Sequence, residues 1–217
     1  MNRTSIEWTD FTWNPVTGCR RDCDYCYARK IAHRFAGSKA FPNGFEPTFH
    51  PERLAQPFML KKPSKIFVCS IGELFGSWVP KQWTRDVIRQ AIYSPWHIFQ
   101  FLTKSPENLS LFPPFPSNCW VGATATDQEM TDHALEHLAK VDTKVKFVSF
   151  EPLLGPVRGD FTGLQWAIIG GQTNPGRLPK LEWVSNLTDD LGRNDVPVFM
   201  KRNAGPFAWD WEPRWPA

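Results

Sequence analysis

The chain has 217 residues, a formal net charge of +3 and 41% hydrophobic residues, which is typical of a folded globular protein and excludes a disordered or fibrous one. Its length favours a single domain over residues 1–217. No apolar run reaches the roughly eighteen residues of a membrane span, and the polar start lacks a signal-peptide core, so we expect a cytoplasmic protein. The weak positive charge suits an anionic partner without requiring one.

Seven short β-rich runs end in small or polar residues and alternate with segments of helical periodicity. This alternation predicts strand and helix units arranged around a parallel sheet, an α/β fold. The expected strands cover residues 11–16, 65–70, 98–103, 120–125, 145–150, 165–170 and 196–200.

Helix starts are marked more clearly than strand ends. Gly37 closes the first expected helix, and Thr126 with Glu129 forms a capping box before a later one. Ser105 and Pro106 mark one further helix start. The expected helices cover residues 24–36, 80–93, 126–140 and 182–191.

Two segments fall outside this alternation. Residues 37–51 form a long loop near the cysteines that is placed to act as a lid. Residues 203–217 form an irregular tail rich in tryptophan, with Trp209, Trp211 and Trp215. Because a complete eight-unit barrel usually needs about 250 residues, the chain length predicts a partial (β/α)6 TIM-like barrel with an open side.

Three cysteines, Cys19, Cys23 and Cys26, crowd into eight residues directly after the first expected strand. In a barrel of parallel strands, chemistry gathers at the C-terminal ends of the strands, where this loop lies. Three thiolates can hold a [4Fe-4S] cluster by three irons and leave the fourth iron open to a ligand such as S-adenosylmethionine (SAM). The spacing lets one loop wrap the cluster without a distant fourth ligand.

Two other states of this loop stay open. A structural zinc ion would normally take four ligands, and the nearest further candidate is His33 on the following helix. Cysteines that bind no metal are the third possibility, although exposed thiols at such density are prone to oxidation. The ligand count therefore favours the iron–sulfur interpretation.

With Tyr25 just before the last cysteine, the motif resembles the signature of the radical SAM superfamily. More narrowly, several segments resemble a phage-type three-Cys-motif family of unknown function. They are EWT at 7–9, WNPVTGC at 13–19, LTK at 102–104, FEPLLGP at 150–156 and IGG at 169–171. Agreement at separated places along most of the chain is far more specific than the cysteines alone.

The resemblance implies that Cys19, Cys23 and Cys26 bind a [4Fe-4S] cluster and that SAM binds the open iron. It also implies a partial barrel fold. Tyr25 would then pack near the adenine of SAM. Packing of this ring into the barrel mouth is an equally good interpretation.

Ser70, Gly72 and Glu73 resemble a degenerate form of the stretch that meets the methionine amino group of SAM in this superfamily. Glycine allows close backbone approach, and a carboxylate can pair with the ammonium group. The alternative is an ordinary turn between a strand and a helix, with Glu73 near the helix start.

Thr124, Thr126 and Asp127 offer oxygen atoms for the ribose hydroxyls of SAM, which the resemblance places in this region. Gly170 and Gly171 resemble the backbone platform against which the adenine or methionine lies. Helix capping also explains Thr126, and two glycines also form a plain turn.

Lys104, Glu151, Lys201 and Arg202 sit at the ends of expected strands, where side chains point toward the cavity mouth. We predict that Lys104, Glu151 and Lys201 act in catalysis, by holding substrate, binding the SAM carboxylate or relaying a proton. A buried ion pair between Lys104 and Glu151 is the alternative, because a lone buried charge is costly.

Two further features look functional but have simpler explanations. Residues 133–137 match the H-x-x-E-H pattern of a zinc peptidase class. The buried stripe of this helix puts both histidines on its flank, outside the barrel, so we expect no peptidase. Cys69 and Cys119 lie in or next to expected strands and are most simply small buried hydrophobic residues.

The sequence thus predicts an oxygen-sensitive radical SAM enzyme that takes electrons from an external donor. The positive charge and the tryptophan-rich tail favour a nucleic acid or nucleotide as substrate, with a peptide as runner-up. From another class, the alternative is a non-catalytic iron–sulfur or zinc protein that binds nucleic acid or a partner protein encoded by a neighbouring gene.

Overall fold

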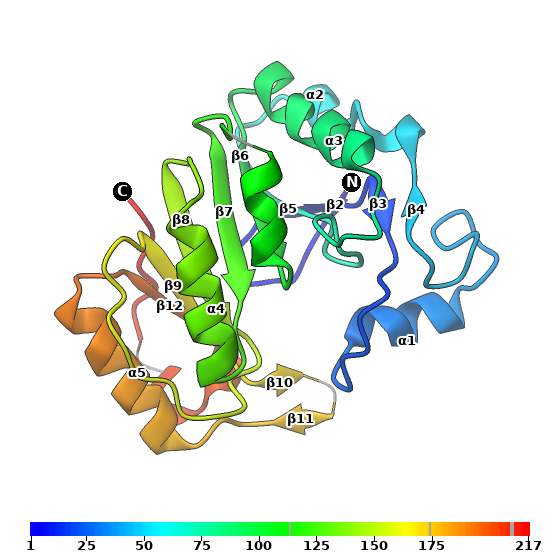
Figure 1. Cartoon of the computed structure of the whole chain (residues 1–217). Coiled ribbons are helices and arrows are strands. Elements are labelled where there is room, and N and C mark those ends of the chain that lie inside the picture. The colour runs from blue at the N-terminus through cyan, green and yellow to red at the C-terminus, as the bar shows by residue number, and fades with distance from the viewer. Residues whose placement is uncertain (113, 174, 209–210) are drawn as a thin grey trace.

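The structure is a computed structural model that describes residues 1–112, 114–173, 175–208 and 211–217. Within these residues, eight strands form one sheet in the order β1-β2-β5-β6-β7-β8-β9-β12 (Figure 1). From β2 to β12 all neighbours are parallel, and only β1 runs antiparallel at the edge. The sheet is therefore mixed but mostly parallel. Its strands are β1 (Asn2–Arg3), β2 (Phe11–Trp13), β5 (Lys65–Val68), β6 (Ile98–Thr103), β7 (Cys119–Thr124), β8 (Val145–Phe150), β9 (Trp166–Ile169) and β12 (Val198–Met200).

All seven expected strands are present in the sheet, and two of them, β6 and β8, have the expected bounds. The first is shorter than expected and ends at Trp13. Pro15 cannot donate a ladder hydrogen bond, and residues beyond it form β3 (Val16–Thr17), which pairs with β4 (Thr48–Phe49). The expected loop over residues 37–51 thus contains a strand.

Five α-helices lie within the described residues: α1 (Tyr27–Arg34), α2 (Gln56–Met59), α3 (Lys81–Tyr93), α4 (Gln128–Leu138) and α5 (Leu181–Arg193). The expected capping box at Thr126 is wrong by one residue, because the side chain of Asp127 caps α4 and accepts from the Met130 amide at 2.9 Å. The expected start at Ser105 leads into a short 3-10 helix, Pro106–Leu111. The crossover 151–165, between β8 and β9, contains no helix.

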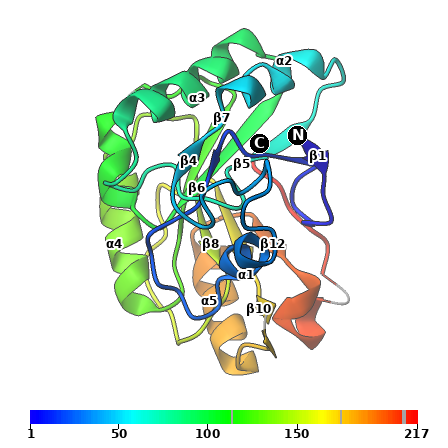
Figure 2. The ribbon, with the colours of Figure 1, turned by 90° about the vertical axis from the view of Figure 1, so that its right-hand side faces the viewer.

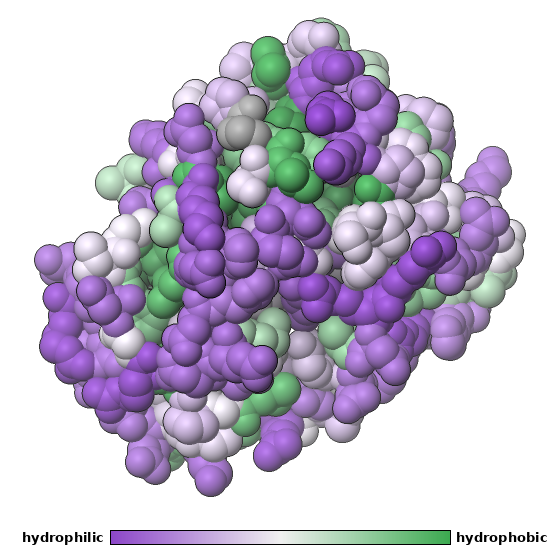
Figure 3. Space-filling view, in the orientation of Figure 1, coloured by the Kyte–Doolittle hydropathy of each residue, from purple (hydrophilic) through white to green (hydrophobic). Residues whose placement is uncertain are grey.

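The two faces of the sheet carry different cores. Side chains alternate along each strand, so Ile66 and Val68 point to one face and Phe67 to the other. On the first face, α3, α4 and α5 pack against the sheet and bury their apolar residues in this core. Figure 2 shows α3 and α4 along one side of the sheet, and in Figure 3 the surface over α4 is mainly hydrophilic. We call the other face, with Phe67, the inner face. It is filled by Trp8, Phe67, Trp120, Phe147, Trp166 and Phe199.

The tail closes the inner face near the strand starts. Trp215 stacks on Trp166 with ring centroids 5.3 Å apart, and it also contacts Phe199 and Trp120. Lys65 Nζ lies 4.2 Å from the centroid of the Trp215 ring. The indole of Trp215 is therefore used within the protein, so Trp215 gives no support to base stacking by the tail. The Trp209 position lies outside the described residues.

None of the helices in the described part of the chain is long and apolar enough to cross a bilayer.

Candidate functional site

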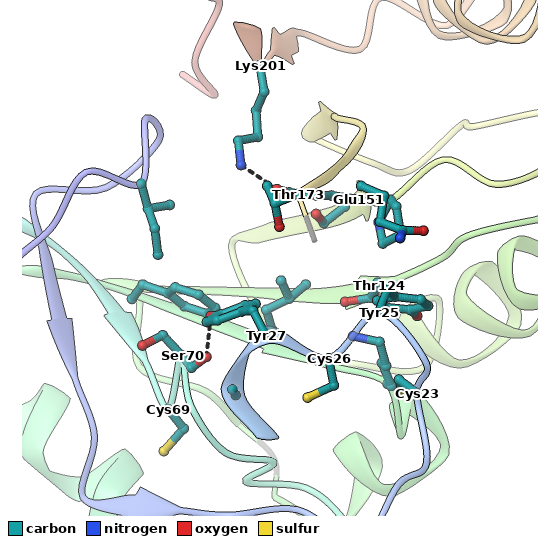
Figure 4. A pocket seen from close by; sticks show the side chains of 18 of the residues that line it. Cys23, Tyr25, Cys26, Tyr27, Cys69, Ser70, Thr124, Glu151, Thr173 and Lys201 are labelled. Carbon is teal, nitrogen blue, oxygen red and sulfur yellow. Dashed lines mark hydrogen bonds and ion pairs between the residues drawn. The ribbon is translucent and has the colours of Figure 1, made fainter. Parts of the chain in front are cut away.

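A cavity of about 540 Å³ lies at the C-terminal ends of the strands, the opposite end from Trp215. Strand ends far apart in sequence meet here because parallel strands place these ends along one edge of the sheet. Figure 4 shows Lys201 and Glu151 across the cavity from Cys23 and Cys26. The predicted site residues that line the cavity are Cys19, Cys23, Tyr25, Cys26, Ser70, Gly72, Glu73, Lys104, Thr124, Glu151, Gly171, Lys201 and Arg202.

Three predicted residues lie beside this cavity and do not line it. Thr126 is buried and donates to Asp127 Oδ2 at 3.2 Å, while Asp127 caps α4. Gly170 lies against the neighbouring charged pair, since a Cβ there would come within 3.1 Å of Lys201 Cδ and 3.3 Å of Glu151 Cγ. Direct contact of these three residues with SAM stays a prediction.

The shape of the cysteine loop depends on two glycines. Gly18 has a φ of +85°, and a Cβ on it would lie 2.3 Å from Glu46 O. Gly18 forms an isolated parallel bridge with Gly72, where a Cβ would lie 2.9 Å from Val16 O. Only glycine permits both close approaches. They join the start of the cysteine loop to the loop that follows β5.

Two of the three sulfur atoms already accept backbone hydrogen bonds. Cys19 Sγ accepts from the Arg21 amide at 3.3 Å, and Cys26 Sγ accepts from the Arg29 amide at 3.4 Å as the N-cap of α1. Amide donors of this kind stabilise thiolates and the clusters that thiolates hold. Burial raises the pKa of the Cys19 thiol to about 11, while the Arg21 amide acts in the opposite direction.

The donor set fits an iron–sulfur cluster. All three cysteines are free, half-buried and on the wall of one cavity. Among the described residues, no trio of Cys, His, Asp or Glu side chains already stands in a metal-binding arrangement.

Two tyrosines of the loop line the cavity. The Tyr25 ring has Lys104 Nζ at 5.7 Å from its centroid, and burial raises the pKa of its phenol, with Cys23 adding to the effect. Tyr27, which sequence reasoning missed, donates its hydroxyl to Ser70 O. Its position one residue after the last cysteine was the available signal.

Glu73 is buried and already has protein partners. Its Oε1 accepts from Thr103 Oγ1 at 2.6 Å and from the Phe75 amide at 3.0 Å, and its Oε2 accepts from the Lys104 amide at 3.0 Å. The carboxylate therefore ties the loop after β5 to the end of β6. Because a carboxylate offers about four acceptor positions, one position on Oε2 remains for a ligand.

The ion pair at the cavity joins Glu151 to Lys201, so the alternative that paired Glu151 with Lys104 is wrong. The side chains of Lys201 and Glu151 are 10% and 22% exposed. Sequence order gave no sign of this pairing, because β12 comes four strands after β8 in the chain, whereas in the sheet only β9 lies between them.

On α4, His133 lies against a carboxylate and Glu136 against a lysine. His133 Nε2 lies 3.1 Å from Glu107 Oε2, and Glu136 forms an ion pair with Lys140 at 2.7 Å. Cys69 lines the cavity and Cys119 does not, although both are buried.

Comparisons with known proteins bear on the fold and the family. No curated protein matches the sequence. The fold resembles the solved structure of a mutant spore photoproduct lyase, with a TM-score of 0.55 at 12% sequence identity, over 90% of this chain and 64% of that one. The chain thus spans just under two thirds of the lyase's length, and the likeness concerns the fold.

Family membership follows from a sequence match to a family model. The family described as "Protein of unknown function (DUF5131)" matches residues 3–211, nearly the whole chain. A phage origin of the family stays a prediction. The protein belongs to the DUF5131 family.

Proposed function

We propose that this protein is a radical SAM enzyme, in which Cys19, Cys23 and Cys26 hold a [4Fe-4S] cluster and SAM occupies the adjacent part of the cavity. One observation carries the proposal. The three cysteines of a single short loop line the same cavity as the polar residues at the ends of five parallel strands. The likeness of the fold to a lyase supports it independently, because that comparison does not depend on the cysteine spacing.

A partial (β/α)6 TIM-like barrel is the fold that we propose to underlie this sheet. The strand order follows the chain order from β2 to β12, as it does when a barrel is wound one unit at a time. The absence of a helix from the crossover 151–165, between β8 and β9, suits an incomplete barrel.

When bound, the cluster supplies one-electron chemistry that splits SAM into methionine and a 5'-deoxyadenosyl radical. The chain's own residues would bind and orient the reactants. Amides of Arg21 and Arg29 hold the sulfur atoms of Cys19 and Cys26. The apolar inner face below excludes water from the reacting atoms.

The SAM contacts follow from the cavity wall. We assign the free acceptor position of Glu73 to the methionine ammonium group, helped by Ser70 and the close backbone at Gly72. Tyr25 would pack on the adenine, Thr124 would bind the ribose, and Gly171 would support the nucleoside. Lys201 and Glu151 would position the reactants as a pair.

The test is anaerobic reconstitution with iron and sulfide, followed by a SAM cleavage assay with a chemical reductant in place of the external electron donor. We expect brown protein that absorbs at about 400 nm and forms 5'-deoxyadenosine. Colour without 5'-deoxyadenosine would indicate a non-catalytic iron–sulfur protein. Tightly bound zinc with no colour would overturn the proposal in favour of a zinc-binding module.

A further inference from the structure

The bottom of the cavity is mainly apolar and combines the inner face of the sheet with residues that precede β2. Trp8, Phe67 and Leu102 line it, and Ile6 adds a further aliphatic wall. Trp8 and Phe67 pack with ring centroids 4.6 Å apart. We call this surface, with Ser149 beside it, the cavity floor. Its aromatic character suits a planar group that can pack against the rings.

Two polar atoms of the floor have no partner in the described part of the protein. Trp8 Nε1 and Ser149 Oγ are both buried without a hydrogen bond, in residues that are 2% and 1% exposed. A buried polar atom left unpaired costs free energy, and native proteins keep few of them. Both residues line the cavity. A ligand seated on the floor would therefore be expected to carry acceptor atoms for an N–H and an O–H.

The mouth of the same cavity has cationic side chains without acidic partners. Within the described residues, no carboxylate lies at ion-pair distance from Lys104, Arg21 or Arg202. Arg21 donates one N–H to Ser105 Oγ at 2.8 Å, while its Nε is buried without a partner. Three carboxylates line the cavity, and each accepts from protein groups: buried Glu73 from three donors, half-buried Glu151 from Lys201, and exposed Glu7 from the Arg202 amide at 3.3 Å.

We propose that the substrate is a nucleotide unit, with its base on the floor and its phosphate near Lys104 and Arg21. This inference rests on the proposed function and names its substrate class. A nucleobase is flat and stacks on aromatic rings. The acceptor atoms at its edge can also take hydrogen bonds from Trp8 Nε1 and Ser149 Oγ. An aliphatic or phenyl side chain of a peptide would leave both atoms unpaired. The basic mouth adds a reason for an anionic group.

The experiment measures binding by calorimetry on anaerobically reconstituted protein with saturating SAM. The probes are the four 2'-deoxynucleoside 5'-monophosphates, the four nucleosides without phosphate, and a phenylalanine-containing tripeptide amide. At least one monophosphate should bind, and more tightly than its nucleoside. Lys104→Met should remove that difference.

The chain offers matched controls for the two orphan atoms. Trp8→Phe and Ser149→Ala should each weaken the best nucleotide about five- to tenfold, since each removes one hydrogen bond. Trp78→Phe and Ser94→Ala delete the same kinds of unpartnered buried atom outside the cavity. These two variants should leave nucleotide affinity unchanged.

Several outcomes would overturn the inference while leaving the proposed function intact. One is SAM binding and cleavage with no affinity for any nucleotide or nucleoside. Another is binding of the tripeptide alone. A third is a loss of SAM affinity, and not nucleotide affinity, in Trp8→Phe and Ser149→Ala, which would assign the floor to SAM. Failure of SAM binding itself would instead contradict the proposed function.

Discussion

The two ends of the inner face use the same strands in different ways. Near the strand starts, Trp120, Trp166 and Phe199 meet Trp215 of the tail and form a closed end of packed rings. At the strand ends the side chains are small, polar or charged, and some are left without partners. We call this the open end.

The closed end of the inner face thus contributes mainly to stability, and the open end mainly to ligand binding. The closed end buries large aromatic area, which is the dominant favourable term in folding. The open end keeps unpaired N–H and O–H groups and a partly buried ion pair, all of which cost free energy or contribute little. Retaining such groups is expected where a ligand completes them.

The largest effect should come from the cysteine loop at the open end. Cys23→Ala should abolish iron and sulfide incorporation, because a cluster held by two cysteines lacks one of its protein ligands. Iron content after anaerobic reconstitution is the measurement. Cys119→Ala, an identical change in the buried β7, should keep its iron. Normal iron content in Cys23→Ala would contradict the ligand assignment.

The next effect belongs to the closed end. Trp215→Ala should lower the free energy of unfolding by about 2 kcal/mol, less than the 3–5 kcal/mol typical of a fully buried tryptophan, because Trp215 is only half-buried. Urea denaturation would measure it. Iron content and SAM affinity should not change. A variant with unaltered stability and weakened ligand binding would show that the tail belongs to the recognition surface.

The ion pair at the cavity should show coupling of about 1–3 kcal/mol. Glu151→Gln and Lys201→Met each leave one partly buried group unpaired. The sum of the two single losses in unfolding free energy should therefore exceed the loss in the double variant. A double-mutant cycle of unfolding free energies gives the coupling. Additive single effects would mean that the Glu151–Lys201 interaction contributes no coupling free energy.

The smallest effect is expected on the outer side of α4. Changing His133 and His137 together to Ala should leave SAM cleavage within a few-fold of the unaltered protein, because Glu107 and not a metal is the neighbour of His133. Quantifying 5'-deoxyadenosine by chromatography tests this. Complete loss of activity would return attention to the H-x-x-E-H pattern.

Much of the fold could be predicted where the signal is local. β6 and β8 are continuous apolar, β-rich runs between turn residues, and both were predicted to the residue. The gathering of strand-end residues with the cysteine loop also followed, because a parallel sheet brings C-terminal ends to one edge. The hairpin of β3 and β4 could not be predicted, since it pairs residues 16–17 with residues 48–49 across a long loop.

The candidate site shows the same division. The three cysteines lie within eight consecutive residues, so their spacing could be recognised from the sequence alone. The partner of Glu151 was not, because the choice between Lys104 and Lys201 depends on which side chains lean across the cavity. Ser149 belonged to no motif, and Trp8 stood only within the EWT segment at 7–9, which gave it no role in the site. They matter because Trp8 Nε1 and Ser149 Oγ are buried without a hydrogen-bond partner among the described residues. This can be recognised only from the positions of the surrounding atoms in the folded protein.

Order along the chain was thus enough to specify alternating strands and helices and a loop of three thiols, because backbone periodicity and short spacings act over a few residues. Tertiary packing decided three further features. These are the pairing of Glu151 with Lys201, the contact of Trp215 with rings near the strand starts, and the presence of buried donors without a protein partner. Those outcomes depend on contacts between residues 50 or more positions apart, such as Lys201 with Glu151, and such contacts exist only once the sheet has assembled.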